Sequence, residues 1–362
     1  MIEHNRKDII FIIGYLSNGG AERVVSVLAN NFIKKGFNVS ILTILGDKKE
    51  YELDSRVKYI PLVSKYNNKL MRILERIVFI RKNIKGLNKC YVISFLAQIN
   101  IYSIVANMFN KSKLIVSERN DPYQDPSSKL VRMVRDFLYN FVDAFVFQTE
   151  DAKNYFSNKI QSKSVVIANP LKENLPEPFI GIREKKIVTA VRLEYQKNVK
   201  MLINAYYKIQ EEYPEYTLDI YGEGPLKDEL INHCKELAIE DKVKFCGYSV
   251  DLHNDILKAK VFVLPSNYEG ISNSMIEALA LGIPVISTDH PIGGAKMFIN
   301  PEVNGLLVNV NDCEATYKAM KRIIENNSLE EKFSKNAINI RQDLNVNKIA
   351  NEWQKFIMRD GY

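Results

Sequence analysis

The sequence predicts an α/β protein of two doubly wound, Rossmann-like domains, each with a mostly parallel sheet covered by helices. Three observations lead to this prediction. The chain has 362 residues, about twice the length of a common domain, and 46% of them are hydrophobic, which is enough for a core in each half. Short apolar runs alternate with amphipathic stretches, as in successive βαβ units. The proline-rich segment 169–179 interrupts this alternation once, which indicates a linker.

The apolar runs are the expected strands, and the amphipathic stretches between them are the expected helices. In the first half the runs are 9–13, 39–44, 57–62, 91–96, 113–117, 144–148 and 164–168, with helices beginning near Gly20 and Lys69. In the second half they are 185–193, 216–222, 242–248, 259–266, 282–288 and 304–310, followed by helical stretches at 314–326 and 349–358. Open parallel sheets bind ligands outside the carboxyl ends of their strands, so functional residues are expected in the loops after strands.

These runs define the expected domains. We place the first domain at 1–175 and the second at 176–345, facing each other across a central cleft. The remaining segment, 346–362, is expected to form a helix that packs back toward the first domain. The four cysteines are scattered without a Cys-x-x-Cys pair, so neither a zinc site nor a disulfide framework is indicated.

One segment, Cys90–Asn110, is uncharged and long enough to cross a bilayer. It contains Gln98, Asn100 and Asn107, and its first part resembles a strand that leads into a helix. We therefore interpret it as a buried strand–helix pair. The apolar run near the N-terminus is too short to span a membrane and ends at Gly-Gly, so it is read as a first buried strand. A cytoplasmic protein is expected.

Positive charge is concentrated in the first half, where 27 Lys and Arg face 16 Asp and Glu, against 23 and 27 in residues 176–362. Within it, the stretch 65–89 holds a single acid, Glu75, and apolar residues at near-helical spacing. Its cations are Lys65, Lys69, Arg72, Arg76, Arg81, Lys82, Lys85 and Lys89, and its apolar residues are Leu70, Ile73, Leu74, Ile77, Val78 and Ile80. This pattern fits either the solvated outer face of a helix or a surface that rests on anionic lipid at the inner face of the membrane. Nucleic acid is not an expected partner, because no aromatic interleaving or known motif accompanies the charge.

Two loops after strands carry residues suited to phosphate. Asn18-Gly19-Gly20 follows the first strand and exposes backbone amides at the start of a helix, where the helix dipole also favours an anion. In the second half, Arg192 stands at a strand end and Lys197 in the following loop. Two cations in such a position could clamp a diphosphate, although either loop alone is a weak signal.

The most informative run is 267–289, which follows the strand 259–266. Glu269 lies in the loop after that strand, and Glu277 follows eight residues later on a helix expected to begin near Ser272. The first amides of this helix would face an anion, and Glu277 could reach a ribose diol. A carboxylate near a helix N-terminus can also be only a capping residue.

Together these motifs make the sequence resemble glycosyltransferase family 4, the retaining GT-B-fold enzymes that include the group 1 glycosyltransferases of bacterial polysaccharide biosynthesis. The resemblance covers nearly the whole chain. It rests on GGAERV at 19–24, SERNDP at 117–122, VRLEYQKN at 191–198, YGEGPLKDEL at 221–230 and EGISNSMIE at 269–277. Each motif is weak alone, and their combination in this order is specific.

The resemblance implies roles for individual residues. Arg192 and Lys197 would hold the donor diphosphate, Glu277 the ribose, and Glu269 the hydroxyls of the donor sugar, so that Glu269, Arg192 and Lys197 are the expected catalytic residues. The remaining donor-binding residues would be Gly19, Gly20, Gly247, Tyr248, Gly270, Ile271, Ser272, Asn273 and Ser274. Fixed cations and helix amides stabilise the charge that develops on the leaving diphosphate, so no metal or other cofactor is expected.

The resemblance also implies the substrates. The donor would be a nucleotide diphosphate sugar, with a UDP-sugar as the default, and the acceptor a polyprenyl-diphosphate-linked or polysaccharide glycan of a capsule or O-antigen. Several relatives carry a histidine near the reacting sugar where this chain has Glu118 and Arg119, so Glu118, Arg119 and Asn120 are assigned to the acceptor side. His290 is expected near the donor.

Other functions fit the residues less well. A non-catalytic glycosyltransferase-like partner subunit usually loses the cation pair or the glutamates, and this chain keeps all four. The characteristic histidine and acid pattern of a sugar-nucleotide epimerase is not visible. A nicotinamide oxidoreductase would need Gly-x-Gly-x-x-Gly in the first loop, which is lacking.

Overall fold

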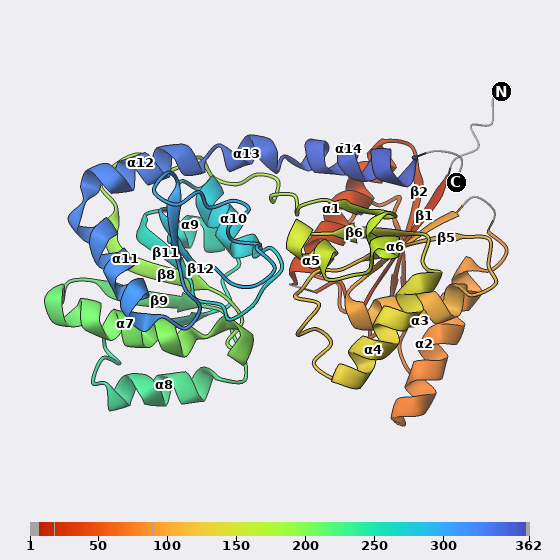
Figure 1. The fold of residues 1–362 in the computed structure, drawn as a ribbon, viewed down its shortest axis with the longest axis horizontal. Coiled ribbons are helices and arrows are strands. Elements are labelled where there is room, and N and C mark those ends of the chain that lie inside the picture. The colour runs from red at the N-terminus through yellow and green to blue at the C-terminus, as the bar shows by residue number, and fades with distance from the viewer. Residues whose placement is uncertain (1–6, 18, 88–89, 360–362) are drawn as a thin grey trace. The chain divides into compact units, whose positions relative to one another are not determined.

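The structure is a computed structural model that describes residues 7–17, 19–87 and 90–359, in which the chain divides into two compact units (Figure 1). The first unit comprises the described residues up to Pro170 together with those from Val346 onward, and the second is Leu171–Asn345. The change of unit therefore comes at Pro170 rather than at residue 175. Asn18 and Lys89, which the sequence interpretation used, lie outside the described residues.

The first unit is built on a parallel sheet with the strand order β3-β2-β1-β4-β5-β6-β7. Its strands are β1 (Asp8–Ile13), β2 (Asn38–Thr43), β3 (Lys58–Pro61), β4 (Cys90–Phe95), β5 (Lys113–Ser117), β6 (Ala144–Phe147) and β7 (Ser164–Val166). Its helices are α1 (Gly20–Lys34), α2 (Lys69–Ile84), α3 (Ala97–Asn107), α4 (Lys129–Leu138), the 3-10 turn η1 (Tyr139–Phe141), α5 (Glu150–Asn154), α6 (Asn158–Gln161) and α14 (Val346–Ile357). The order in which strands join the sheet reverses at this point: β2 and β3 lie on one side of β1, and β4 to β7 lie on the other.

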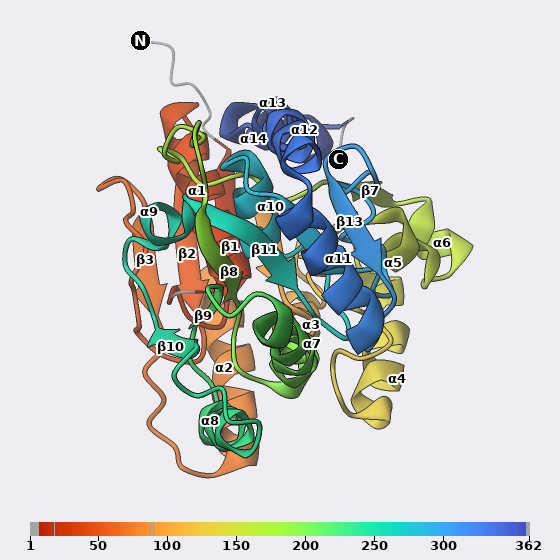
Figure 2. The same ribbon diagram turned by 90° about the vertical axis from the view of Figure 1, so that its left-hand side faces the viewer.

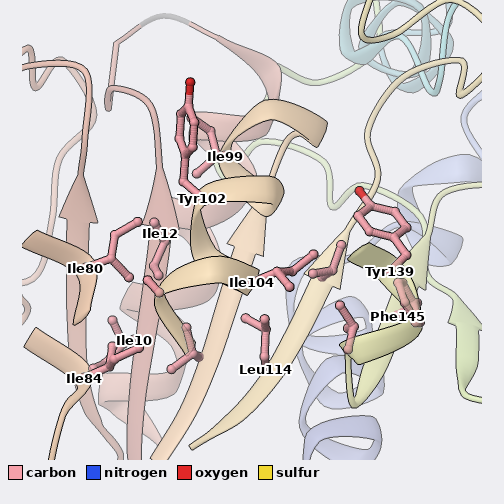
Figure 3. Close-up of a cluster of buried hydrophobic side chains, with 14 of the residues drawn as sticks. Ile10, Ile12, Ile80, Ile84, Ile99, Tyr102, Ile104, Leu114, Tyr139 and Phe145 are labelled. Carbon is pink, nitrogen blue, oxygen red and sulfur yellow. The ribbon is translucent and has the colours of Figure 1, made fainter. Parts of the chain in front are cut away.

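Both faces of this sheet are covered. On one face α2 and α3 pack on β1 and β5, with residues such as Ile80, Ile104 and Leu114 in one buried cluster (Figure 3). On the other face α1 and α14 bring aromatic rings onto the strands. The Phe11 and Phe32 rings lie 6.2 Å apart, and the Phe95 and Trp353 rings 5.7 Å apart. The helix at the end of the chain thus belongs to the core of the first unit.

The uncharged segment Cys90–Asn110 forms the buried strand β4 and the helix α3, as expected. The side-chain amide of Asn100 donates to the Ser117 carbonyl, 3.2 Å away, and to the Tyr139 hydroxyl, 3.1 Å away, so its buried NH2 group has partners inside the unit. Over the described part of the chain, no helix combines the length and the apolar character that a membrane crossing requires.

The second unit holds a parallel sheet with the order β10-β9-β8-β11-β12-β13 and faces the viewer in Figure 2. Its strands are β8 (Glu184–Ala190), β9 (Thr217–Tyr221), β10 (Val243–Gly247), β11 (Ala259–Leu264), β12 (Val285–Thr288) and β13 (Gly305–Val308). Its helical elements are the 3-10 turn η2 (Tyr195–Lys197) and the helices α7 (Val199–Glu212), α8 (Lys227–Glu236), α9 (Leu252–Ile256), α10 (Asn273–Ala280), α11 (Cys313–Glu325), α12 (Asn327–Ala337) and α13 (Ile340–Asp343). The order in which strands join this sheet reverses between the neighbouring strands β8 and β11: β9 and β10 lie beyond β8, and β12 and β13 lie beyond β11.

On the helix from Lys69 the apolar residues differ in burial. In α2, Ile80 is buried and Ile77 packs against the core, whereas Leu70, Leu74 and Val78 are exposed. The basic residues of α2 also differ in their contacts. Arg76 donates to the Ile44 carbonyl and Arg81 to the carbonyls of α3 and the residues after it, so neither belongs to a solvated basic face.

Candidate active site

The predicted donor residues of the second unit gather where β8 and β11 end side by side. The loop after β8 runs over the neighbouring strand, since the Val191 amide donates to the Tyr221 carbonyl at 3.0 Å. It then turns at Asn198, whose left-handed φ of 46° lets α7 begin at the next residue. The side-chain amide of Asn198 donates to the side-chain oxygen of Asn267 at 2.9 Å, which ties this loop to the loop after β11. The reversal point of an open parallel sheet is where such folds bind ligands.

Lys197 and Glu269 form an ion pair at this junction. Glu269 is buried, and its Oε1 also accepts a hydrogen bond of 3.1 Å from the Ser266 hydroxyl. Gln196 donates to the Tyr268 carbonyl at 2.9 Å, which holds the backbone next to Glu269. The structure therefore brings together two residues that lie 72 positions apart and that the sequence analysis assigned to one site.

Arg192 lies at the same edge but is differently placed. Its side chain is 65% exposed, and its guanidinium is 3.7 Å from the Glu194 carboxylate, a distance at which the pair is loose. A cation that is mobile and solvated can move onto a diphosphate at little cost, whereas Lys197 is already fixed. The two predicted cations thus differ in exposure and in how closely they are paired.

Glu277 is buried on α10, where its Oε2 lies 3.0 Å from Nε2 of His253. His253 is on α9, and the sequence analysis gave it no role. The contact could not be read from a motif, because it depends on how two successive helices pack against each other. It can fix the carboxylate of Glu277 at the position from which a ribose would be bound.

The segment after β12 packs closely behind Glu269. A Cβ atom on Gly294 would lie 1.7 Å from the Gly270 carbonyl oxygen, so only glycine fits there. His290 is buried in this segment, where its Nδ1 lies 3.1 Å from the Pro291 carbonyl and its Nε2 has no hydrogen-bond partner among the residues described. Burial lowers the pKa of His290, and the nearby Glu269 opposes this, so the imidazole is neutral at pH 7.

The helix α10 begins at Asn273 after Ser272, whose side chain makes no capping hydrogen bond to it. Its first backbone amides face away from their own helix and can receive an anion. Gly247 has a left-handed φ of 68° and accepts a 2.7 Å hydrogen bond from the Gly222 amide, while the Tyr248 ring is exposed. An exposed ring beside a fixed turn is a suitable surface for a base to stack on.

In the first unit, Gly19 and Gly20 stand at the start of α1 after β1. Gly19 precedes the helix without a side-chain cap, and its carbonyl accepts a 3.0 Å hydrogen bond from the Tyr51 hydroxyl. This hydrogen bond holds the turn, and the assignment of Gly19 and Gly20 to a phosphate loop stays a prediction.

The three residues assigned to the acceptor side point in different directions. Glu118 is buried and accepts a hydrogen bond from the Tyr139 hydroxyl, and burial raises its pKa to about 7. Arg119 lies 4.7 Å from the Phe95 ring and donates to Asn169 at 2.9 Å, and burial lowers its pKa to about 9. Asn120 is partly buried and accepts from the amide of the next residue. Glu118 is therefore held inside the first unit by Tyr139, and its place on the acceptor side stays a prediction.

A hollow of the second unit lies elsewhere. It has a volume of about 1090 Å³ and is bounded by residues 177–183 and α12. These residues lie at the amino ends of β8, β11 and β12, the edge opposite the loops that carry Lys197 and Glu269. Its charged wall is internally paired, since Glu330 contacts both Arg183 and Lys260. We therefore do not assign the donor to this hollow.

Comparison with known families matches both halves of the chain. The group 1 glycosyltransferases match residues 172–340, and glycosyltransferase family 4 matches residues 18–174. Both families were expected from the sequence motifs.

Two curated relatives come from Campylobacter jejuni. One, a GalNAc-alpha-(1->4)-GalNAc-alpha-(1->3)-diNAcBac-PP-undecaprenol alpha-1,4-N-acetyl-D-galactosaminyltransferase, is 30% identical over 96% of this chain and 98% of its own length. The other, an N-acetylgalactosamine-N,N'-diacetylbacillosaminyl-diphospho-undecaprenol 4-alpha-N-acetylgalactosaminyltransferase, is 28% identical over the same shares. Both names specify transfer to a lipid-linked glycan.

Solved structures agree in fold. HepE from Anabaena, determined with UDP and glucose, superimposes with a TM-score of 0.83 at 16% identity, covering 97% of this chain and 99% of its own. TarM from S. aureus, determined with UDP, Fondaparinux and alpha-GlcNAc-glycerol, gives a TM-score of 0.77 at 16% identity, covering 97% and 100%. At this identity the similarity establishes the two-domain α/β fold of GT-B enzymes.

Proposed function

Because this chain belongs to the group 1 glycosyltransferases of family 4, and is therefore a glycosyltransferase, we propose that it transfers a hexose or N-acetylhexosamine from a UDP-sugar to a polyprenyl-diphosphate-linked glycan, with retention of anomeric configuration. The product would enter a surface polysaccharide such as a capsule or O-antigen. The observation that carries the proposal is the Lys197–Glu269 ion pair at the reversal point of the second sheet, with Glu277 on the adjoining helix α10.

The cations support a transfer that needs no metal. Breaking the bond between the anomeric carbon and the diphosphate leaves negative charge on the phosphate oxygens. Lys197 is fixed next to Glu269, and exposed Arg192 can close on the diphosphate, while the amides at the start of α10 add further positive potential. Together these groups can stabilise the leaving nucleotide.

The ion pair also bears on the role of Glu269. Both partners are largely buried, and Ser266 donates to the same carboxylate oxygen, so the lone pairs of that oxygen are already engaged. A carboxylate held in this way is suited to accept hydrogen bonds from sugar hydroxyls. We therefore assign retention to front-side displacement, in which the leaving phosphate takes the acceptor proton, rather than to a glycosyl-enzyme on Glu269.

The relatives direct the choice of substrates. Both Campylobacter jejuni proteins are named as N-acetylgalactosaminyltransferases acting on undecaprenol diphosphate glycans, and both names specify an α linkage. We therefore propose UDP-N-acetylhexosamine as the first donor to test, followed by UDP-galactose and UDP-glucose, with the enzyme working peripherally at the inner face of the cell membrane.

The test is a transfer assay in EDTA with a panel of UDP- and GDP-sugars and a polyprenyl-diphosphate sugar. We expect one UDP-sugar to be consumed without metal, and the α configuration of the product to be visible in the anomeric proton coupling. Glu277→Ala should raise the donor KM by about tenfold or more, through loss of a charged hydrogen bond to ribose. His233→Ala on α8, away from the site, should behave as wild type.

Three results would count against the proposal. A requirement for divalent metal would contradict the role of the cations, and a β-linked product would contradict retention. If no sugar is transferred and calorimetry detects no UDP binding, the chain is instead a non-catalytic partner subunit.

A further inference from the structure

The helix α4 differs from an ordinary surface helix, because it buries a charged side chain and exposes apolar ones. All of its residues are described, and Arg135 is the one that is buried, while four of its large apolar side chains are exposed and Leu138 packs against the core. Leu130 and Phe137 are 69% and 65% exposed, and Met133 and Val134 are exposed between them. An amphipathic helix on a globular protein normally packs its apolar stripe on the core. Here that stripe has no cover.

The inversion is fixed by Arg135. Its guanidinium donates to the Asp125 carbonyl at 2.6 Å and to the Pro122 carbonyl at 3.0 Å, and it pairs with Asp136. It also lies over the rings of Tyr155 and Phe156, at 5.2 and 5.3 Å. Residues three and four positions from Arg135 share its face of the helix, whereas Met133, Val134 and Phe137 are one or two positions away, on another face, and are exposed. The exposed stripe therefore follows from the way in which the contacts of Arg135 orient α4.

A second exposed apolar stripe runs along α2. Leu70, Leu74 and Val78 follow one another at four-residue spacing and are all exposed, while Ile80 and Ile84 of α2 are buried in the core. Both α2 and α4 contact α3, which lies between them on the same side of the sheet (Figure 2). Phe141, just after α4, continues the stripe of α4. We call the exposed apolar residues of α2, α4 and η1 the apolar face.

The charges around the apolar face identify its partner. The exposed cations at its border are Lys65, Lys69, Arg72, Lys82, Lys85 and Lys129. Acids are few: α3 has no charged residue, α2 has Glu75 alone, and α4 has Asp136 alone, which is paired with Arg135. Apolar side chains bordered by lysine and arginine are the chemistry of a helix that lies in the surface of an anionic membrane.

We propose that the apolar face inserts into the surface of an anionic lipid bilayer, with α4 as the main inserting element and α2 supplying most of the charge. The inference rests on the proposed function, since a polyprenyl-linked acceptor lies in such a bilayer. It goes beyond that proposal because it assigns the contact to α4, which carries apolar side chains rather than a basic run. The contact does not depend on donor or acceptor, so it can be tested without catalysis.

The test is flotation of the full chain with acceptor-free vesicles of phosphatidylethanolamine and phosphatidylglycerol, against phosphatidylcholine vesicles. We expect binding to the anionic vesicles. Leu130→Ser with Phe137→Ser should lower the partition coefficient about a hundredfold, at about tenfold for each side chain removed from lipid. Lys69→Gln with Arg72→Gln should lower it by about tenfold or more, and this loss should shrink in high salt.

A matched control comes from the second unit. Ile180 and Ile182 are 95% and 97% exposed, so Ile180→Ser with Ile182→Ser removes as much exposed apolar surface outside the apolar face and should leave binding unchanged. Phe137→Trp gives a positive signal, since its emission should shift to the blue with anionic vesicles. Unchanged far-UV circular dichroism and melting of each variant show that the fold is kept.

The outcomes separate this inference from the proposed function. Equal vesicle binding by wild type and the Leu130/Phe137 variant would overturn it. It would also be overturned if the chain self-associates without lipid and this variant abolishes the association, since the apolar face would then join two copies. Sugar transfer to a short-chain, water-soluble acceptor is measured in a separate assay. Vesicle binding without any sugar transfer would contradict only the proposed function.

Discussion

At the scale of single residues, burial decides what each charged group of this chain can do. Lys197 and Glu269 are both removed from solvent, and each neutralises the other. Arg192 remains exposed with a loose partner. Glu118 is buried without a cation in direct contact, and its carboxyl receives the Tyr139 hydroxyl instead. The first pair can bind and orient, Arg192 can move onto a ligand, and Glu118 is a structural acid.

Glu118 makes the stability of the first unit depend on pH. Burial raises its pKa from 4.5 to about 7, so the folded state binds a proton that the unfolded state has already released. The resulting stability is fully present below pH 4.5 and is lost as the pH rises through 7. Glu118→Gln should therefore gain about 2–3 kcal/mol relative to wild type on going from pH 5 to pH 8.

Urea unfolding followed by Trp353 fluorescence can measure this difference, because Trp353 is the single tryptophan of the chain and lies in the core of the first unit. Glu150→Gln, an exposed glutamate at the start of α5, is the matched control and should show no such change. If the curves of wild type and Glu118→Gln stay parallel between pH 5 and pH 8, the buried acid is not the source of the dependence.

The sequence could indicate which residues form the donor site but not how they pair. Lys197 and Glu269 each belong to a motif, and the reversal of chain direction between β8 and β11 explains why they meet. His253 could not be found, because its contact with Glu277 depends on how α9 packs against α10 and no local pattern reports that packing. The burial of Glu118 could not be foreseen for the same reason, because an acid after a strand looks alike in the sequence whether it faces a ligand or the core.

At the scale of elements, the donor site depends on loops that touch through backbone atoms. The Gly270 carbonyl lies against Gly294, which has no room for a Cβ atom, so the loop of Glu269 and the segment after β12 support each other. Gly294→Ala should displace the Glu269 loop, because a backbone oxygen cannot move aside as a side chain can. We expect kcat/KM for transfer to fall by about tenfold or more, which corresponds to about 1.4 kcal/mol.

Steady-state kinetics, together with hydrogen exchange of peptides that cover 266–276, can test this expectation. Met297→Ala changes an exposed side chain in the same segment and should leave both measurements near wild type. Gly294→Ala with normal kcat/KM would show that this segment does not support the site.

The strands were predictable and the outward faces of helices were not. Apolar runs in a parallel sheet are buried on both sides, so they stand out in the sequence, and the expected strands coincide with β1 to β13 to within a few residues. In a helix, apolar periodicity has the same form whether the apolar stripe faces the core or the surroundings. The exposed stripe of α4 therefore becomes visible only when the burial of Arg135 is known.

At the scale of the whole molecule, the chain crosses between its two compact units twice. It enters the second unit at Leu171 and returns to the first at Val346, so α14 completes a core that began to form some three hundred residues earlier. Within the first unit Trp353 packs on Phe95 of β4, and Arg119 lies 5.5 Å from the same indole. The sequence predicted a terminal helix that packs toward the first domain, but not that its tryptophan would be among the largest fully buried side chains.

Trp353→Ala should therefore destabilise the first unit by about 3–5 kcal/mol and leave the second almost unchanged, because the cavity opens in one core only. Hydrogen exchange read peptide by peptide can separate the units: protection should fall in β1, β4 and α1 and persist in β8, β11 and α7. Trp353→Phe keeps an aromatic ring against Phe95 and should lose less than half as much. An equal loss of protection in both units would mean that they unfold together, and α14 would then stabilise the whole chain rather than the unit it completes.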